Sequence, residues 1–321
     1  MLNKKTLSLF SIFSLINLFC IASFSQTPKK LKTIVVDAGH GGHDNGATGQ
    51  YENSLRSKEK DVTLAISKKV VAELKKQLPE LNIVPTRTTD IYQPVNDKAR
   101  IANEYKGDLF LCIHADSGPL KTGRRQIGTR TVTRYKVTYT GKGKKRKKKS
   151  TPYQVTEPVY EYFKLPLKAR GTSVYIFAAH KTSAKLKAIM DEVGEFEIET
   201  NEGDSTYTPI DFSSPGNKTI AQIYATRYQM KSDLLASMVN DEVEKTGRIA
   251  LGVNQRQVGI AVLQATSMPA ILIETGFINN PEDERYINSE SGQQEMAEAI
   301  TQAVIRYKEQ LENPTKTVIN K

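Results

Sequence analysis

Three short apolar runs most constrain the fold of this chain. They span residues 33–38, 108–113 and 269–277, and a polar stretch follows each of them. Such runs are typical of strands that are buried on both faces of an α/β sheet. The first run is followed by His40, the second is followed by His114, and the third contains Glu274 near its end. Since ligands bind beyond the carboxyl ends of such strands, we expect these side chains to lie near the functional site.

Helical periodicity fills the segments between these runs. In residues 59–78, apolar side chains recur at every fourth position, at Val62, Ile66, Val70, Leu74 and Leu78. This spacing places them on one face of an amphipathic helix. Further helices are predicted at residues 94–105, 180–193, 218–244 and 292–311, and further strands at 81–86 and 171–178. Strands that alternate with helices predict a single α/β domain.

The amino-terminal residues have the composition of a secretory signal peptide. Lys4 and Lys5 precede a mostly apolar stretch at residues 7–22, and serine occupies positions 23 and 25. We expect a signal peptide over residues 1–25 and an exported mature chain over residues 26–321. The apolar stretch is close to the minimum length for crossing a bilayer, so a retained membrane anchor is the alternative. In the mature chain Cys112 is the only cysteine, which excludes an internal disulfide.

A long insertion interrupts the alternation between about residues 118 and 240. Its first part predicts an exposed basic hairpin at about 127–163, with the lysine-rich residues 142–149 at its tip. The whole chain has a formal net charge of +11, to which this run contributes a large part. Such runs are usually solvated loops, but they can attract anionic polymers. For an exported protein we expect an acidic wall or envelope polymer, and no nucleic acid, as the partner.

His40, Glu59 and His114 form a candidate zinc site. Zinc prefers nitrogen and carboxylate donors, and catalytic zinc sites commonly use three protein ligands, which leaves one position for water. Glu59 begins the helix that follows the glycine-rich loop after His40, so it can fold back towards the end of the first strand. Either histidine alone is equally consistent with a structural role. Their joint position at two strand ends favours a metal site.

Glu274 is the candidate general base. A carboxylate at the end of an apolar strand is partly desolvated and close to the strand ends that carry the histidines. The alternative is that Glu274 caps a loop or pairs with Arg285. Asp37 is expected either to orient a ligand imidazole or to serve as a structural turn residue. We exclude His43, in the glycine-rich loop, and His180, at the start of a helix, from the predicted metal site.

Four motifs in the same order resemble those of the zinc-dependent N-acetylmuramoyl-L-alanine amidases of the cell-separation type. They are DAGHGG at residues 37–42, EKD at 59–61, IHAD at 113–116 and IETGFINNPED at 273–283. The resemblance covers most of the mature chain, and four motifs in the correct succession are more specific than any single glycine-rich loop. One departure is Ala38, where the family frequently has proline.

The resemblance implies hydrolysis of the amide bond between N-acetylmuramic acid and the L-alanine of the stem peptide in peptidoglycan. In that family the residues that match His40, Glu59 and His114 bind one zinc ion, and the residue that matches Glu274 acts as general base and then as acid. The family fold is a mixed central sheet with helices on both faces. A periplasmic monomer with a role in wall turnover and daughter-cell separation, and with no stable membrane span after signal cleavage, is the expectation.

The resemblance also suggests a regulatory role for the insertion. Some members carry a helix over the zinc with a glutamate that blocks the open position, until a partner protein displaces it. Here residues 180–240 would be the autoinhibitory segment, and Glu192 or Glu195 would be the blocking residue. An activator protein would then be a partner of the enzyme.

Two other functions use the same residues. The first is another zinc hydrolase of peptidoglycan, such as a carboxypeptidase or a deacetylase, because the same ligand chemistry would serve it. The second is a non-catalytic envelope protein that binds peptidoglycan. The order of the motifs favours the amidase over the first, and the presence of all four site residues favours it over the second.

Overall fold

The computed structural model describes residues 30–178, 183–193, 215–256 and 259–313. The expected signal peptide, His180 and Glu195 lie outside these ranges. The strands of the body are β1 (Thr33–Ala38), β2 (Asn82–Pro85), β3 (Leu109–Asp116), β6 (Thr172–Ile176), β7 (Ala250–Gln255) and β8 (Ala270–Phe277). Its helices are α2 (Glu59–Gln77), α3 (Val95–Glu104), α4 (Ser183–Val193), α5 (Pro215–Lys245), α6 (Ala261–Ala265), α7 (Pro281–Asn288) and α8 (Glu290–Glu312).

The six strands form one mixed sheet in the order β2-β1-β3-β8-β6-β7. Strand β1 is parallel to both β2 and β3, and β3 is parallel to β8. Strand β6 is antiparallel to β8 and parallel to β7. This arrangement confirms the prediction of a mixed central sheet. It also brings the carboxyl ends of β1, β3 and β8 to one edge.

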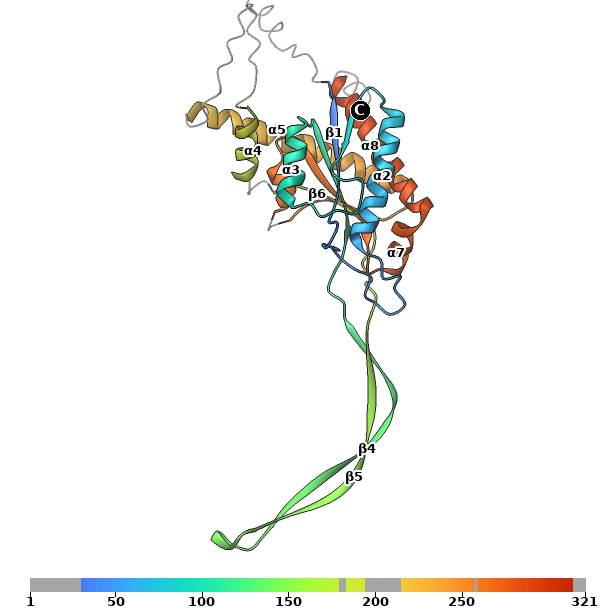
Figure 1. Cartoon of the computed structure of the whole chain (residues 1–321), viewed down its shortest axis with the longest axis vertical. Helices are drawn as coiled ribbons and strands as arrows, with labels where there is room; N and C mark the ends of the chain where they lie inside the picture. Colours follow the sequence, from blue (N-terminus) through green and yellow to red (C-terminus); the bar gives the residue numbers. More distant parts are fainter. Residues whose placement is uncertain (1–29, 179–182, 194–214, 257–258, 314–321) are drawn as a thin grey trace, which may run out of the picture.

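Both faces of the sheet are covered by helices, as predicted (Figure 1). Successive strand residues point to opposite faces, so Ile34 and Val36 join one buried cluster and Val35 joins the other. The first cluster contains residues of α2, α5 and α8, and the second contains residues of α3 and α6. All three β1 side chains are fully buried. This two-sided burial explains why the strands appear in the sequence as uninterrupted apolar runs.

Three elements of the body, β7, α6 and α7, were not predicted from the sequence, and α6 has only 5 residues. Strand β7 lies at the edge of the sheet, and most of its side chains are half-buried or exposed, so no apolar run marks it. Helix α7 has only 8 residues. It begins after Asn280, whose side chain accepts hydrogen bonds from the backbone N–H groups of Glu282 and Asp283, and Pro281 occupies its first turn.

The insertion begins with a long two-stranded hairpin that projects from the body (Figure 1). Its strands are β4 (Thr122–Thr140) and β5 (Lys147–Lys164), which pair from Thr122↔Lys164 at the root to Thr140↔Lys147 at the far end. The prediction that the lysine run forms the tip was wrong in part, because lysines 147–149 belong to β5. Pro152 and Pro158 lie within β5.

Among the described helices, none combines the length and apolarity that a membrane crossing requires.

Candidate metal centre

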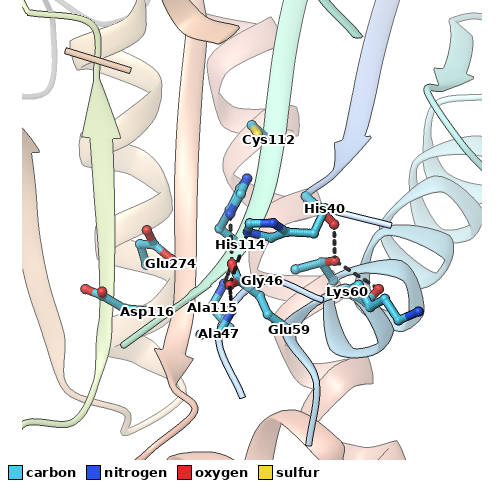
Figure 2. A network of polar contacts seen from close by, with 12 residues as sticks. His40, Gly46, Ala47, Glu59, Lys60, Cys112, His114, Ala115, Asp116 and Glu274 are labelled. Carbon is cyan, nitrogen blue, oxygen red and sulfur yellow. Dashed lines mark hydrogen bonds and ion pairs between the residues drawn. The ribbon is translucent and has the colours of Figure 1, made fainter. Parts of the chain in front are cut away.

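The register of the sheet brings the predicted site residues to the same end of the sheet, where strands β1, β3 and β8 finish. Strand β1 pairs with β3 up to Ala38↔Ile113, and β3 pairs with β8 at His114↔Glu274. His40 follows β1 by two residues, and Glu59 is the first residue of α2. Figure 2 shows His114 between His40 and Glu274, with Glu59 directed towards both imidazoles. Residues that are far apart in the sequence therefore meet because three strands end together.

Glu59 bridges the two histidines. Its Oε1 lies 2.8 Å from Nδ1 of His114, and its Oε2 lies 3.2 Å from Nε2 of His40. The ligand atoms of the three residues all lie within 4.8 Å of one another. Zinc bonds of about 2.0–2.2 Å in a tetrahedral site place ligand atoms roughly 3.3–3.5 Å apart. The three residues therefore offer donor types that zinc prefers, and their donor atoms lie close enough together to share one ion.

The backbone around the site leaves no space for larger residues. A Cβ atom on Gly46 would lie 2.5 Å from Oε2 of Glu59, and one on Gly39 would lie 2.5 Å from Nε2 of His114. His40 itself has a φ of 58°, in the left-handed region that non-glycine residues rarely adopt. Such strain is often found at functional sites, where the surrounding structure enforces it. The loop after β1 is thus shaped around these three side chains.

Asp44 holds the imidazole of His40, a role that the sequence alternatives gave to Asp37. Nδ1 of His40 lies 2.8 Å from Oδ2 of Asp44, which leaves Nε2 directed at Glu59. An acidic partner on the second ring nitrogen orients a metal-binding histidine. Asp44 in turn accepts a hydrogen bond from the backbone N–H of Gly46. Asp44 lies just beyond the DAGHGG motif, four residues after His40, and its role depends on the turn between them.

Asp37 lies in a buried ion pair at the end of β1. Its Oδ1 is 3.0 Å from Nζ of Lys98 and accepts a hydrogen bond from Thr86, and its Oδ2 accepts one from the thiol of Cys112. Asp37, Cys112 and His114 also have donor atoms within 4.8 Å of one another. Asp37 already has the cation Lys98 as its counter-ion, whereas no lysine or arginine among the described residues pairs with Glu59, so the group that contains Glu59 is the better candidate for a metal ion.

The electrostatics of the three residues favour a bound cation. Burial alone would lower the pKa of His40, but its contacts with Glu59 and Asp44 raise it to about 9. Burial alone would raise the pKa of Glu59, but the two histidines lower it well below its ordinary value. The carboxylates of Glu59 and Asp44 therefore create a negative potential at His40. A divalent ion satisfies the same potential.

Glu274 is buried beside the metal residues, with 4% of its surface exposed. Desolvation by burial raises its pKa to about 7, although His114 and Arg256 oppose this shift. The guanidinium of Arg256 donates to its Oε1 at 2.8 Å, while its buried Oε2 has no hydrogen-bond partner among the described residues. The predicted alternative, a pair with Arg285, is wrong because Arg256 is the partner.

Arg256, like Asp44, is a site residue that the sequence analysis missed. It follows β7, the strand that lacks a sequence signal, and it lies over the ring of Tyr175 with 4.6 Å from its Cζ to the ring centroid. In the sequence, the only signal at this position is an arginine that follows Asn254 and Gln255. Together with His40, Glu59, His114 and Glu274, it lines a cavity of about 390 Å³.

The remaining candidate residues do not line this cavity or lie outside the described residues. His43 is exposed and its ring stacks on Tyr92, with 4.0 Å between ring centroids. This agrees with its exclusion from the metal site. Glu192 belongs to α4, but its side chain is not among those described, and neither is any part of Glu195. The predicted blocking glutamates are therefore not located.

Comparison with known proteins agrees with this geometry. The N-acetylmuramoyl-L-alanine amidase family matches residues 34–306. The N-acetylmuramoyl-L-alanine amidase AmiA of Escherichia coli is 27% identical over 276 residues, which cover 86% of this chain and 76% of AmiA. AmiC of another Escherichia coli strain is 28% identical over 275 residues, which cover 85% of this chain and 52% of AmiC.

A solved structure has the same fold. The crystal structure of N-acetylmuramoyl-L-alanine amidase from Clostridium difficile matches with a TM-score of 0.52 at 22% identity, and the match covers 87% of this chain and 97% of that chain. The family match extends over most of the chain and includes all four motifs. This chain therefore belongs to the N-acetylmuramoyl-L-alanine amidase family.

Proposed function

We propose that this protein hydrolyses the amide bond between N-acetylmuramic acid and L-alanine in peptidoglycan, with one zinc ion held by His40, Glu59 and His114. Family membership supplies the bond that is cleaved. The observation that supports the mechanism is the convergence of three side chains that could hold a metal ion beside a buried carboxylate oxygen that has no hydrogen-bond partner among the described residues. When bound, zinc would polarise the scissile carbonyl and the attacking water.

Glu274 is the group that moves the proton. Its Oε2 lacks a hydrogen-bond partner among the described residues, so it is available to accept a proton from the attacking water. A pKa raised to about 7 by burial suits a group that accepts this proton and then donates it to the departing nitrogen. The site must both accept the proton from water and donate it to the nitrogen, because an amide nitrogen is a poor leaving group until it is protonated.

Arg256 is a positioning residue for Glu274. Its guanidinium binds Oε1 at 2.8 Å and so fixes the direction of Oε2. Its other surface is accessible, since 42% of its side chain is exposed and it lines the cavity. The chain therefore fixes its base with a residue from the neighbouring loop.

Muropeptide analysis tests this function. Sacculi are digested with the native enzyme, with Glu274→Gln and with a chelated sample to which zinc is later returned. We expect intact stem peptides and glycan strands without peptides from the native enzyme, and neither from Glu274→Gln or the chelated sample. Release of single amino acids would indicate a carboxypeptidase, release of acetate a deacetylase, and no product a non-catalytic binding protein. Activity that survives chelation would contradict the zinc mechanism.

We extend the proposal to the setting of the enzyme. We propose a periplasmic monomer that takes part in wall turnover and daughter-cell separation, and that is restrained by Glu192 or Glu195 until an activator protein displaces the insertion. These features rest on the motif resemblance. A Glu192→Ala/Glu195→Ala double variant should raise the activity of the isolated enzyme on sacculi. Unchanged activity would exclude self-inhibition through these residues.

A further inference from the structure

The root of the hairpin lines a second hollow that shares lining residues with the metal cavity. The backbone N–H of Glu52 donates to the carbonyl of Lys164 at 3.0 Å, and the side chain of Glu52 pairs with Arg125 of β4. A second hollow of about 320 Å³ is lined by Lys164 together with Ala47 and Ser117. Ala47 and Ser117 also line the metal cavity. A polymer that leaves the metal cavity through this hollow therefore reaches the hairpin.

The strand register gives the distal hairpin one strongly basic face. Side chains of directly paired residues lie on the same face, and successive residues alternate between faces. The pairs Arg130↔Glu157, Arg134↔Tyr153, Lys136↔Thr151, Thr138↔Lys149 and Thr140↔Lys147 share one face. The pairs Thr131↔Thr156, Thr133↔Gln154, Tyr135↔Pro152, Val137↔Ser150 and Tyr139↔Lys148 share the other. The first face carries five basic residues and one acid, whereas the second carries one lysine.

Positive charge is neutralised near the root but not near the tip. Glu157 pairs with Arg130 and Arg134, and Glu161 pairs with Arg125. Residues 136–149 contain eight lysine or arginine residues and no aspartate or glutamate. Among the described residues, no carboxylate forms an ion pair with the lysines of this stretch. Its charge is therefore available for an anion outside this chain.

We propose that the distal hairpin binds the free carboxylates of peptidoglycan peptides and so tethers the polymer beside the metal cavity. This inference rests on the proposed function, which makes peptidoglycan the substrate. The 19 residues of β4 would extend roughly 60 Å at about 3.3 Å per residue, so the tip contacts the polymer far from the scissile bond. The tether raises the local concentration of substrate at the cavity and leaves the chemical step unchanged.

The composition of the tip favours this partner over a membrane surface. Residues 140–151 consist of lysine, arginine, glycine, serine and threonine, and the exposed Tyr135, Val137 and Tyr139 lie nearer the root on the face opposite the basic one. Segments that lie in a membrane interface combine basic residues with large apolar residues that enter the lipid. A wholly polar tip with dense positive charge is suited to a hydrated polymer that carries carboxylates.

Co-sedimentation with purified sacculi tests the tether. The basic-face variant Lys136→Gln/Lys147→Gln/Lys149→Gln is compared with a control that removes the same charge from exposed lysines of α2 and α4, Lys68→Gln/Lys75→Gln/Lys187→Gln. At low salt we expect about a tenfold loss of affinity for the basic-face variant and less than a twofold loss for the control, with the difference largely lost at high salt. Amidation of the sacculus carboxylates should reduce native binding to a similar extent.

Hydrolysis of a soluble muramoyl peptide separates this proposal from the proposed function. Both triple variants should retain the native rate on this small substrate. If neither the native protein nor the two variants hydrolyse the muramoyl peptide, but the basic-face variant still binds sacculi more weakly than the control, the tether is supported and the amidase function is contradicted. Equal affinities of the two variants, or native binding that is indifferent to amidation, would overturn the tether. Tighter native binding to phosphatidylglycerol vesicles than to sacculi would overturn it in favour of a membrane surface.

Discussion

At the metal centre Glu59 is 4% exposed and its two oxygens contact both histidines and the backbone N–H groups of Ala47 and Ala115. In the hairpin, by contrast, the side chain of Tyr135 is 64% exposed and most residues contact only the opposite strand. The first region is held by strands, helix α2 and a loop that are distant in the sequence. The second is held by pairing within one short stretch of the chain.

This difference predicts how each region responds to change. At the metal centre a single substitution removes a partner from a buried polar group, which is costly because water cannot replace it. In the hairpin water already solvates most side chains, so the same kind of substitution has little effect on folding. We therefore expect chemistry and stability to depend on the first region, and attraction to the polymer on the second.

The largest expected effect is on activity, from Glu274→Gln. The amide cannot accept the proton of the attacking water, so kcat should fall by about 10²–10⁴-fold. Bound zinc, measured by elemental analysis, should be unchanged because Glu274 is not in the ligand set. Arg285→Gln is the matched control and should retain native activity. A Glu274→Gln enzyme with more than a tenth of the native kcat would contradict the role of Glu274.

Among the substitutions considered, the largest effect on stability is expected at the buried ion pair between Asp37 and Lys98. Burial alone would raise the pKa of Asp37. The charge of Lys98 and the hydrogen bonds from Thr86 and Cys112 have the larger effect and hold this pKa below its ordinary value. Lys98→Met leaves this carboxylate buried without its cation and should cost about 3–5 kcal/mol in the free energy of unfolding. Urea denaturation measures the loss. Adding Asp37→Asn should recover part of it, and a double variant no more stable than Lys98→Met would argue against the ion pair.

A smaller, pH-dependent effect is expected at Glu284, which secures the loop that leads to Glu59. Burial would raise its pKa, but hydrogen bonds from Tyr51, Ser57, Ser54 and the backbone of Leu55 lower it below 4.5. The ionised form therefore stabilises the fold fully above pH 4.5, and this contribution is lost as the pH falls through the lowered pKa.

Urea unfolding at two pH values measures this contribution. At pH 7, Glu284→Gln should be about 1–3 kcal/mol less stable than the native protein. At pH 3 the difference should shrink. Glu282→Gln, on the same helix but exposed, should change stability by less than about 0.5 kcal/mol at either pH. A difference that grows on acidification would refute the assignment.

The smallest effect is expected from shortening the hairpin. Residues 131–156 are replaced by Asn-Gly, which joins the paired residues Arg130 and Glu157 by a two-residue turn. The free energy of unfolding should change by less than about 0.5 kcal/mol, because the removed part has little contact with the body. A loss above about 1.5 kcal/mol in urea denaturation would mean that the hairpin is not independent of the body.

The sequence predicted those parts of the fold that carry a strong local signal. The apolar runs predicted β1, β3 and β8, and the four-residue spacing predicted α2 within one residue of its end. His40, Glu59, His114 and Glu274 could be named because each lies at the end or start of such an element. The distances between these residues could not be predicted, because the distances depend on the order of the strands in the sheet.

The missed features depend on tertiary contacts or lack periodicity. Strand β7 pairs with β6, and only its Ala250 and Val253 pack against the core while partly buried, so its sequence carries little apolar signal. Arg256 comes directly after this strand in the sequence. It can pair with Glu274 of β8 because β6 and β7 lie next to β8 in the sheet. The role of Asp44 required the turn at His40, with its positive φ.

The two prolines of β5 have a consequence for the behaviour of the protein at high concentration. A projecting two-stranded ribbon exposes two unpaired edges, which in other proteins recruit strands from further copies and begin aggregation. Pro152 and Pro158 have no backbone N–H, and the neighbouring lysines repel one another between copies. We therefore expect the β5 edge and the lysines to oppose strand pairing between copies where the proposed tether concentrates the enzyme on a polymer.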